Sequence, residues 1–469
     1  MQRWRSCRAV WFVPGAAVLA LGLLAPPRAA AQPPLLPAGG EFQVNTYTTQ
    51  RQRLPSVGAY AKGSFIVVWP SNGSPETDTS SDSIQGQRYA TDGSPQGAQF
   101  QVNSYTTGYQ SNPSVAASAD GDFVVVWAGP EIQAQRYASD GSPQGAEFQV
   151  NTYTTGLQTN PSVAADPDGD FVVVWHGNGS FGTDTSLFHT SIQGQRYASD
   201  GSTQGAQFQV NTYTTERQRF PVVAAEANGD FVVVWNSLGG YGTDTHSYSI
   251  QGQRYASDGS TQGAQFQINT YTTGSQHSAQ MAMDADGDFV AVWDYNGPMD
   301  GDIFPRASLG QRFASSGSAL GAEFHVNAYT TGDQGEPSVA KHPDGGFVVV
   351  WESVGSWGTD PSNFSIQGQL YASDGSTQGA QFQVNSYTTD VQQFPRVAVA
   401  ADGDIVVVWH SLGSSGTDTS MESIHAQRYR PPIVAPALSP VAIAVLGAAL
   451  ILLGVAFARA YRSVKGRSS

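Results

Sequence analysis

A short apolar run that ends in tryptophan recurs seven times along the middle of the chain. In the third copy it reads FVVVW and ends at Trp175, directly after a polar segment rich in Asp and Gly. An unbroken run of β-branched and aromatic residues predicts a strand that is buried on both faces. The seven tryptophans follow one another at intervals of 58, 48, 60, 58, 58 and 58 residues: Trp69, Trp127, Trp175, Trp235, Trp293, Trp351 and Trp409. The pattern therefore predicts seven copies of one β-unit.

Each unit predicts four strands. In the third unit they are expected at residues 161–165, 170–175, 192–198 and 206–211. The last strand alternates apolar and polar residues, so we expect its polar side chains to face outward: Gln207, Gln209 and Asn211. Antiparallel strands graded from buried to exposed and repeated seven times predict an all-β fold, a seven-bladed β-propeller over residues 32–430. An array of small β-sandwich repeats is the alternative.

The two ends of the repeat array complement each other. The seventh unit stops at Arg430 without a fourth strand, whereas residues 41–45 (EFQVN) form a fourth strand without a unit of their own. We expect the N-terminal strand to pair into the last blade and close the ring. A linear solenoid would need capping units at its ends, and the sequence contains none.

Residues 166–170 (DPDGD) pose a question of chemistry, because alternating Asp around Gly is how a calcium loop begins. Only the Gly at the fourth position persists in all seven units, usually after Asp or Asn, which predicts a two-residue hairpin turn that needs a positive φ. Weak calcium binding stays open at two units only: Asp166, Asp168, Asp170, Asp284, Asp286 and Asp288. No other cofactor is expected.

Long inserts between the second and third strands carry Gly-Thr-Asp-Thr-Ser or a close variant in five units. In a propeller these inserts share one face with the loops that lead from fourth to first strands. Recurrent Thr, Asp and aromatic groups suit contact with sugars or with a protein partner. The alternative is that they are ordered loops whose Asp and Thr cap their own turns. The candidate ligand-binding residues are Phe181, Asp184, Tyr241, Asp244, Trp357, Asp360 and Asp418.

The third strands carry a repeated arginine in every unit except the sixth, where Leu370 replaces it. We expect each arginine to pair with a blade carboxylate or stack on the neighbouring Trp; a ring that binds an anion is the alternative. The fifth unit departs most from the repeat, and drift in one copy explains this as well as a site does. Its insert region holds side chains that suit acid–base work or a cation: Asp294, Asp300, Asp302 and Arg306.

The N-terminal 31 residues have the order of a secretory signal. Arginines are followed by an apolar stretch and then by small residues, with cleavage expected after Ala31. The one cysteine of the sequence, Cys7, precedes the apolar stretch, so the mature protein is expected to hold no disulfide and no thiol site.

The C-terminal end predicts an anchor. A Pro-rich linker (residues 431–440) leads to an unbroken apolar run at 441–458, long enough for a transmembrane helix, and a basic tail at 459–469 is expected on the cytoplasmic side. A Pro-bearing motif, an apolar span and a basic tail resemble the C-terminal sorting signals of exosortase-type systems, in particular the variant that opens with Ile-Pro-Thr-Leu. Here PALSP (436–440) stands in that place, without the Ile, the Thr or the following Trp.

Charge excludes one class of partner. The two ends hold eight of the 23 basic residues and none of the acidic ones, which leaves 15 basic and 38 acidic groups in residues 32–430. Such a surface repels phosphate backbones, so we expect no nucleic-acid partner. The expected associations are a polysaccharide or surface protein at the insert loops and a membrane at the C-terminal helix, with the propeller a monomer.

The sequence as a whole resembles repeat-bearing surface proteins of Gram-negative bacteria. That resemblance implies an exported propeller at the cell envelope or surface, anchored by its C-terminal helix or released after processing. No Gly-x-Ser-x-Gly elbow, His-Glu-x-x-His pair or phosphate loop is present. We therefore expect non-catalytic recognition or adhesion. The alternatives are a polysaccharide hydrolase or lyase with its acids in the fifth blade, and a structural envelope component.

Overall fold

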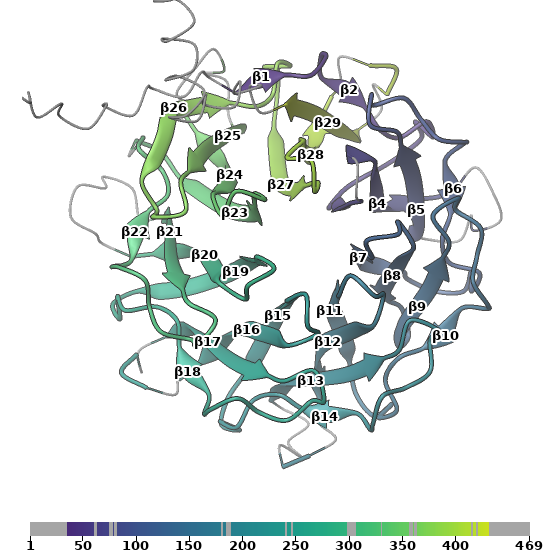
Figure 1. The fold of residues 1–469 in the computed structure, drawn as a ribbon. Helices are drawn as coiled ribbons and strands as arrows, with labels where there is room; N and C mark the ends of the chain where they lie inside the picture. The colour runs from purple at the N-terminus through teal and green to yellow at the C-terminus, as the bar shows by residue number, and fades with distance from the viewer. Residues whose placement is uncertain are drawn as a thin grey trace, which may run out of the picture. The chain divides into compact units, whose positions relative to one another are not determined.

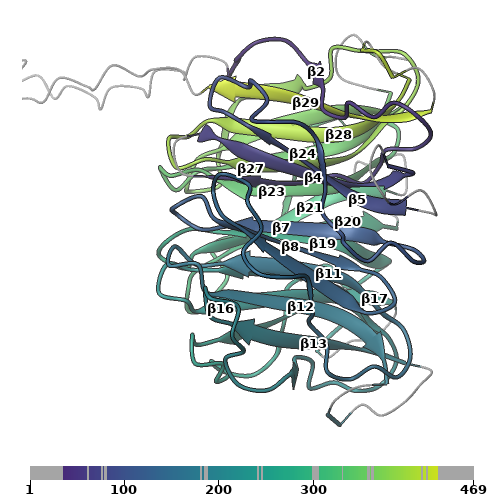
Figure 2. The ribbon, with the colours of Figure 1, turned by 90° about the vertical axis from the view of Figure 1, so that its right-hand side faces the viewer.

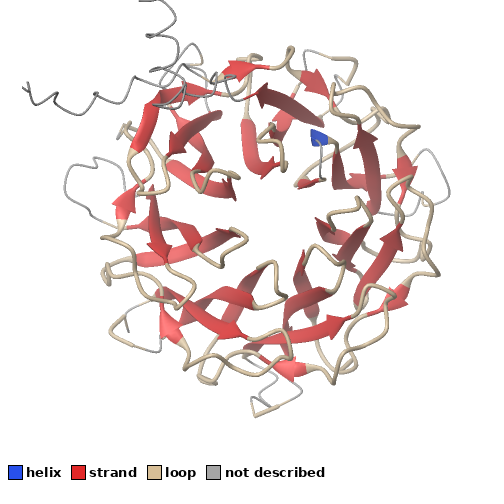
Figure 3. Cartoon of the chain, in the orientation of Figure 1, coloured by secondary structure: helices blue, strands red, loops and turns tan. Residues whose placement is uncertain are grey.

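Strands and loops make up almost the whole of the described part of the chain (Figure 3). The computed structural model describes residues 35–60, 63–74, 78, 82–179, 182–183, 189–239, 242–244, 247–297, 306–329, 331–355, 360, 364–413, 416–418 and 421–430. Their strands form seven antiparallel sheets arranged in a ring (Figure 1), which confirms the seven-bladed β-propeller. Each sheet is one blade packed between two others, so the array of β-sandwiches is ruled out.

The blades share one strand order, from the centre of the ring outward (Figure 1). The first strands, nearest the centre, are β3 (Ser56–Ala59), β7 (Ser111–Ala117), β11 (Gln158–Ala165), β15 (Gln218–Ala225), β19 (Ser275–Met283), β23 (Gln334–Lys341) and β27 (Gln392–Val399). The second strands are β4 (Phe65–Asn72), β8 (Phe123–Ala128), β12 (Phe171–Asn178), β16 (Phe231–Leu238), β20 (Phe289–Asn296), β24 (Phe347–Val354) and β28 (Ile405–Leu412).

The fourth, outermost strand of each blade is shorter than the other three. The third strands are β5 (Asp82–Tyr89), β9 (Ile132–Tyr137), β13 (Thr190–Tyr197), β17 (Tyr248–Tyr255), β21 (Arg306–Phe313), β25 (Phe364–Tyr371) and β29 (Glu422–Arg430). The fourth strands are β6 (Phe100–Gln101), β10 (Phe148–Gln149), β14 (Phe208–Gln209), β18 (Phe266–Gln267), β22 (Phe324–His325), β26 (Thr377–Gln383) and, in blade seven, β2 (Phe42–Gln43).

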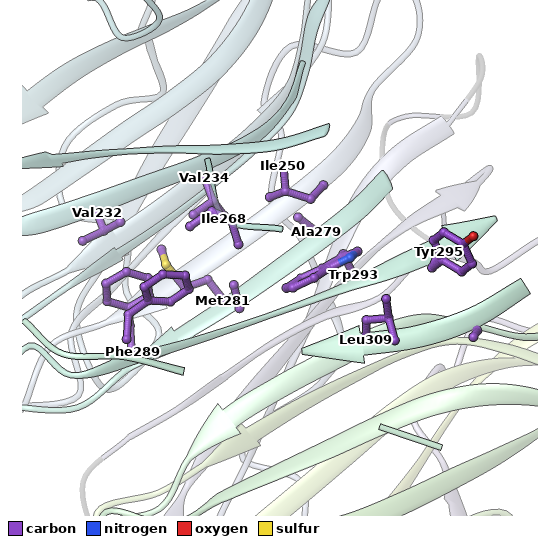
Figure 4. Packing of buried hydrophobic residues seen from close by; sticks show 13 residues of the cluster. Val232, Val234, Ile250, Ile268, Ala279, Met281, Phe289, Trp293, Tyr295 and Leu309 are labelled. Carbon is purple, nitrogen blue, oxygen red and sulfur yellow. The ribbon is translucent and has the colours of Figure 1, made fainter. Parts of the chain in front are cut away.

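The hydrophobic core lies between the blades rather than within them. All seven repeated tryptophans are fully buried, and each belongs to a cluster that joins its own blade to the preceding one. In Figure 4, Val232 and Val234 of blade four lie beside Met281, Phe289 and Trp293 of blade five. Figure 2 shows the blades stacked on one another in this way. Burial on both faces is why the second strands are apolar at every position.

A glutamine 17 residues before the tryptophan satisfies its buried indole N–H. Trp175 Nε1 donates to Gln158 Oε1 at 3.0 Å, and the same bond occurs in blades one, two, four and six. This matters because an unpaired buried donor costs about 1–3 kcal/mol. The Gln at the start of the first strand therefore belongs to the core.

The Asp-Gly segments are hairpin corners. In blade three, Asp166 N–H donates to Asp170 O and Gly169 N–H donates to Asp166 O, which defines a loop of three residues. Gly169 has a φ of +88°, the left-handed position that closes such a loop. The predicted corner is confirmed, but the predicted two-residue form is wrong, because the glycine follows the turn as a bulge.

The fourth strand corrects a second expectation. Gln207 and Asn211 are buried, not exposed. Gln207 Oε1 accepts from the N–H of Thr152 at 2.8 Å, across the blade boundary, and Asn211 Oδ1 accepts from Ile192 N–H at 2.7 Å. Alternation predicted exposure because it weighs polarity alone, whereas these amides are buried as partners of loop backbone.

The ring closes as the two chain ends predicted. Strand β2 pairs with β29, with Phe42 opposite Ala426 and Gln43 opposite His425. A further strand, β1 (Leu36–Pro37), also pairs with β29, in the place that Pro95 takes beside Tyr89 in blade one. Glu41 secures the closure, because its carboxylate accepts from the N–H groups of Ser386 and Tyr387 in the preceding loop.

Glu41 also contacts His425, at 2.8 Å between Oε1 and Nδ1. Burial raises the pKa of Glu41, but the hydrogen bonds from His425, Tyr387 and Ser386 outweigh it, so the net pKa is lowered. In blade one the same two positions hold Gln99 and Gln85, joined at 3.0 Å. The closing blade therefore has a carboxylate and an imidazole where blade one has two amides.

No helix within the described residues is long and apolar enough to span a bilayer. The predicted signal (1–31), linker (431–440), apolar segment (441–458) and basic tail (459–469) lie outside the described residues, and they stay predictions.

We expect Glu41→Ala to lower the free energy of unfolding by about 2–3 kcal/mol, because four donors of Ser386, Tyr387 and His425 lose their acceptor. The double variant Glu41→Gln/His425→Gln restores the amide pair of blade one and is expected to stay within about 1 kcal/mol of the wild type. Chemical denaturation measures both. Equal losses in the two variants would contradict this account of the closure.

Candidate functional site

Two sets of loops form one face of the ring, which we call the insert face: the inserts after the second strands and the loops before the first strands. In blade one, Asn103 Nδ2 donates to Asp78 Oδ2 in the insert at 3.0 Å and to Tyr105 O in the following loop at 2.9 Å. Asn103 Oδ1 accepts from Ile84 N–H at 2.8 Å. One buried amide thus holds both loops, as the shared face predicted.

The same arrangement holds the other inserts. The predicted ligand-binding carboxylates Asp244, Asp360 and Asp418 are at most 1% exposed. Each accepts from an asparagine of the fourth strand, at 2.8–3.0 Å: Asn269, Asn385 and Asn45. In this structure the three carboxylates hold the inserts in place, and ligand contact through them stays a prediction. Phe181, Asp184, Tyr241 and Trp357 lie outside the described residues.

Blade two has no long insert, yet it keeps the bond. Asn151 Nδ2 donates to Glu131 Oε2, in the short turn between β8 and β9. A carboxylate therefore occupies this place even where there is no Gly-Thr-Asp-Thr-Ser segment. The loop differs between the blades, but a carboxylate that accepts from the asparagine persists. The aspartate of the insert therefore has a structural role.

Asp360→Ala is expected to lower the free energy of unfolding by about 1–3 kcal/mol, because Asn385 would lose a buried charged acceptor. Asp360→Asn keeps an acceptor oxygen and is expected to cost less. Thermal unfolding of the two variants makes the comparison. If Asp360→Ala leaves stability unchanged, the carboxylate does not anchor the insert.

The repeated arginines join neighbouring blades and do not form an anion site. Each donates to a backbone carbonyl in the turn between third and fourth strands of the next blade. The pairs are Arg88–Ser139, Arg136–Asp200, Arg196–Ser257, Arg254–Ser316, Arg312–Ser373 and Arg428–Thr91. The structural expectation holds, and the partner common to all six is a carbonyl group rather than the expected carboxylate. Arg428 also pairs with a carboxylate of its own blade, Asp404, at 3.6 Å.

The ring closure explains why Leu370 takes the place of the repeated arginine in blade six. Blade seven takes its fourth strand from the N-terminus, so it has no continuous turn after its third strand for an arginine of blade six to bind. Leu370 instead packs against the apolar cluster that also contacts Leu35. The one irregular position in the arginine series thus lies where the chain begins and ends the ring.

The aspartates at which calcium binding stayed open accept hydrogen bonds from backbone N–H groups of their own turns. Asp166 Oδ1 accepts from the N–H groups of Asp168 and Asp170, and Asp284 Oδ1 accepts from those of Asp286 and Asp288. Asp284 also pairs with Lys341 at 2.9 Å. Within the described ranges, no group of three or more His, Cys, Asp or Glu side chains is placed to hold a metal ion. Calcium binding therefore has no converging ligand set here.

A cavity of about 370 Å³ lies between blades two and three, on the face opposite the inserts. Its polar lining also serves the turns. Asp122 accepts from Ser139 N–H at 2.9 Å and from Gln144 Nε2 at 2.8 Å, and Arg136 Nη2 donates to Gln144 Oε1 at 2.9 Å. These groups have structural partners, so the cavity offers no evident chemistry.

The inner rim of the insert face has a different character. It consists of the residue after each repeated tryptophan and a bulge residue in each first strand. All seven bulge residues have a φ between +47° and +55°: Leu54, Asn112, Asn160, Phe220, Ser278, Glu336 and Phe394. Backbone strain of this kind in residues other than glycine often marks functional positions.

The rim joins consecutive blades through one hydrogen bond. In blades three and four, the N–H of Phe220 donates to His176 Nδ1 at 3.2 Å. Burial, together with Arg219, lowers the pKa of His176 to about 3, so the ring is neutral and accepts. The same bond links Glu336 N–H to Asp294 Oδ1 at 2.9 Å and Phe394 N–H to Glu352 Oε2 at 3.3 Å.

In blades five and six the rim holds a charged cluster. The structure brings together two of the four residues predicted in the fifth unit: Arg306 Nη2 lies 2.7 Å from Asp294 Oδ2. Arg306 also contacts Glu336 Oε1 at 3.1 Å and Glu352 Oε1 at 3.2 Å. Three carboxylates from two blades thus share one guanidinium. Asp300 and Asp302 lie outside the described residues.

Two further side chains lie at the edge of this cluster. His277 Nδ1 is 3.6 Å from Asp294 Oδ2, and Arg396 comes from the first strand of blade seven. Asp294 and Glu352 are buried, whereas His277, Arg306 and Glu336 keep 31%, 22% and 21% of their side chains exposed. The cluster therefore has a buried floor and a solvent-facing edge.

Burial and the neighbouring carboxylates together raise the pKa values of the buried carboxyl groups. Burial, then the charge of Glu336, raises the pKa of Asp294 well above its usual value, against the opposing effect of Arg306. Burial and Glu336 likewise raise the pKa of Glu352 to about 7. Burial and Arg306 lower the pKa of His277. The raised pKa values favour the protonated form of Asp294 and Glu352, and the lowered pKa favours the neutral imidazole of His277.

The predictions from the sequence included Asp294 and Arg306 but missed His277, Glu336 and Glu352. The signal that identifies the missed carboxylates becomes visible when the seven repeats are aligned. The residues after the tryptophans are Pro70, Ala128, His176, Asn236, Asp294, Glu352 and His410, and only two consecutive blades carry a carboxylate there. Of the seven bulge residues, Glu336 alone is charged, and it lies between those two carboxylates in sequence.

Glu352 makes the stability dependent on pH. Its folded-state pKa lies above that of the unfolded chain, so its contribution is present below about pH 4.5 and is lost as pH rises through about 7. A shift of this size corresponds to about 3 kcal/mol. We expect Glu352→Gln, which cannot ionise, to gain stability relative to the wild type between about pH 5 and about pH 8. Denaturation at both values tests this, and a constant difference would contradict it.

The described residues thus define a seven-bladed β-propeller with insert loops anchored by buried asparagines and a charged inner rim in blades five and six. No protein-family model matches the sequence, and no curated protein matches it significantly.

The chain is similar to several solved structures over most of its length. One is a protein of unknown function from Dyadobacter fermentans, at 10% identity over 85% of this chain and 99% of that one, with a TM-score of 0.48. The polysaccharide lyase Uly1 matches at 9% identity, 82% and 90% coverage and a TM-score of 0.49. The Pan2 WD40 domain of Neurospora crassa matches at 9% identity, 85% and 98% coverage and a TM-score of 0.46. At these values the likenesses carry no argument about activity, and the fold rests on the strand topology.

Proposed function

We propose that this protein recognises carbohydrate through the insert face of its propeller. The observation that carries the proposal is where the structure leaves large apolar side chains exposed. The described residues expose seven of them, and six lie at the insert-face ends of strands or in the loops there: Tyr105, Tyr109, Leu157, Phe220, Leu412 and Met421. Only Leu36, in β1, lies elsewhere. Such a one-sided distribution indicates a binding face.

Phe220 is the best-defined of these side chains. It is a bulge residue with a φ of +53°, and its ring remains 46% exposed while it contacts His176 at a centroid distance of 5.4 Å. The ring is thus held in place before any ligand arrives, and a fixed aromatic face suits stacking against a sugar ring.

The surroundings favour a glycan over a protein partner. The six side chains are distributed over blades one to four and blade seven, next to loops rich in Thr, Asn and Gln. A protein interface concentrates its apolar residues in one buried core. An extended polysaccharide touches several separate aromatic and polar groups instead, which matches this distribution.

The sequence at the two ends supports a location for this activity. A secretory signal and a C-terminal apolar segment would carry the propeller out of the cytoplasm and hold it at the envelope or cell surface, whether the segment is kept or processed. We propose adhesion or glycan recognition there, by a monomer with its insert face turned away from the membrane. A surface protein is the other ligand that the same face suits.

Glycan-array binding of the full-length protein tests the proposal. We expect Phe220→Ala and Tyr109→Ala each to weaken binding about three- to tenfold, the loss of one stacking contact. Leu36→Ala removes an equally exposed apolar side chain on the other side of the ring and is expected to have no effect. Absence of glycan binding, or an equal loss in Leu36→Ala, would leave a protein ligand or a structural envelope role.

A further inference from the structure

Two exposed groups capable of proton transfer flank one buried carboxylate on the inner rim. Asp294 Oδ2 faces His277 Nδ1 at 3.6 Å in the same blade, and Asp294 Oδ1 accepts from the N–H of Glu336 in the next blade at 2.9 Å. Asp294 is fully buried, while His277 and Glu336 both reach solvent. The carboxylate therefore contacts an imidazole of its own blade and the backbone of a residue of the next blade that carries a carboxyl group.

The structural task of the rim does not require this charge. One acceptor is enough to join two blades, and a neutral imidazole provides it between blades three and four. In blades five and six the rim instead brings Asp294, Glu336 and Glu352 onto one guanidinium. Burying two carboxylates beside a third is costly, and their presence needs a reason other than packing.

A second observation points to a ligand beside His277. Asn236 is 1% exposed, and its Oδ1 has no hydrogen-bond partner. Asn236 takes the place in blade four that Asp294 takes in blade five, and the bulge residue that corresponds to Glu336 in that arrangement is Ser278, next to His277. A buried acceptor without a partner at this point is suited to receive a hydroxyl group.

We infer that the inner rim hydrolyses a glycosidic bond of the glycan held on the insert face, with Glu336 as the general acid and His277 as the general base. The inference rests on the proposed function, since it needs a glycan on that face. Arg306, Asp294 and Glu352 position the two reacting groups and do not themselves touch the substrate.

The step balances with water as co-reactant. Glu336 gives its proton to the glycosidic oxygen as the bond from that oxygen to the anomeric carbon breaks. The oxygen of a water molecule bonds to the anomeric carbon, and its proton passes to His277 Nε2. Solvent then takes the proton from the imidazole and returns one to Glu336, so two hydroxyl ends form and the enzyme is unchanged.

The charges at the rim indicate the substrate class. Elimination from a uronate chain needs a cation to neutralise the sugar carboxylate, and Arg306 already contacts three carboxylates. The acidic surface of the chain also repels polyanions. The substrate is therefore a neutral glycan, cleaved by hydrolysis.

The repeats themselves provide substitutions that the fold accepts. Gln393 takes the place of His277 in blade seven, and Asn112 and Asn160 take the place of Glu336 in blades two and three with the same positive φ. His277→Gln and Glu336→Asn are thus expected to fold normally, which thermal unfolding checks. Glu216→Gln, an exposed carboxyl-to-amide change in a loop of the same face, is the matched control.

The experiment incubates the full-length protein with the neutral glycans that it binds on the array and measures released reducing ends. We expect kcat to fall about 100-fold or more in His277→Gln and in Glu336→Asn, with glycan binding kept and the control unchanged. Asp294→Asn, which keeps an acceptor for Glu336 N–H, is expected to lower kcat while KM stays the same.

The pH profile separates a catalytic from a structural role of the imidazole. The charged groups that act on His277 are Asp294, Arg306 and Glu336, and Glu352 and Arg396 belong to the same cluster through Asp294. A general base must be unprotonated, so kcat is expected to fall at low pH in the wild type. This acidic limb is expected to disappear in His277→Gln.

Each outcome decides between the two proposals. Bound glycans that release no reducing ends overturn the hydrolysis and leave the recognition intact. Turnover that survives both substitutions overturns the assignment of His277 and Glu336. Unsaturated ends released from polygalacturonate, seen by ultraviolet absorbance, overturn hydrolysis in favour of elimination. A protein that binds no glycan overturns both proposals.

Discussion

The whole architecture depends on second strands that are apolar on both faces. A sheet with such a strand can bury it only if another sheet packs on each side. Seven blades in a row would leave the first and last with one exposed apolar face, and a closed ring leaves none. The fully buried tryptophans, each shared between two blades, are the largest side chains in these contacts. Closure of the ring is therefore a consequence of the hydrophobic pattern.

Polar contacts then give the blades a fixed register around the ring. Buried amides hold the insert loops, arginines reach the next blade's turn, and in five blades a glutamine satisfies the indole N–H group. One exception follows from the closing point: Leu370 has no turn to bind, because blade seven is assembled from the two ends of the chain. Glu41 takes the place of a glutamine as Glu147 and Glu323 do in blades two and five, whereas its contact with His425 is particular to the closing blade.

The inner rim is the place where the repeat is free to vary. Its side chains face solvent or the next blade's bulge, and a single acceptor is enough to join the blades there. Neutral residues fill this place in five blades, whereas blades five and six carry carboxylates and an arginine. Burial of these charges raises the pKa of Glu352 to about 7 and so couples the stability of the fold to proton binding.

The sequence by itself determined the number of blades, their strand order and the closing strand, because these depend on local periodicity and on tryptophan spacing. It also predicted Asp294 and Arg306 as a departure from the repeat. Only the tertiary structure decided that Asp244, Asp360 and Asp418 are buried beside asparagines. Only it brought Glu336, 42 residues further along the chain, against Asp294. The physical reason is that contacts between blades join residues about one repeat apart, and strand periodicity within one blade carries no information on them.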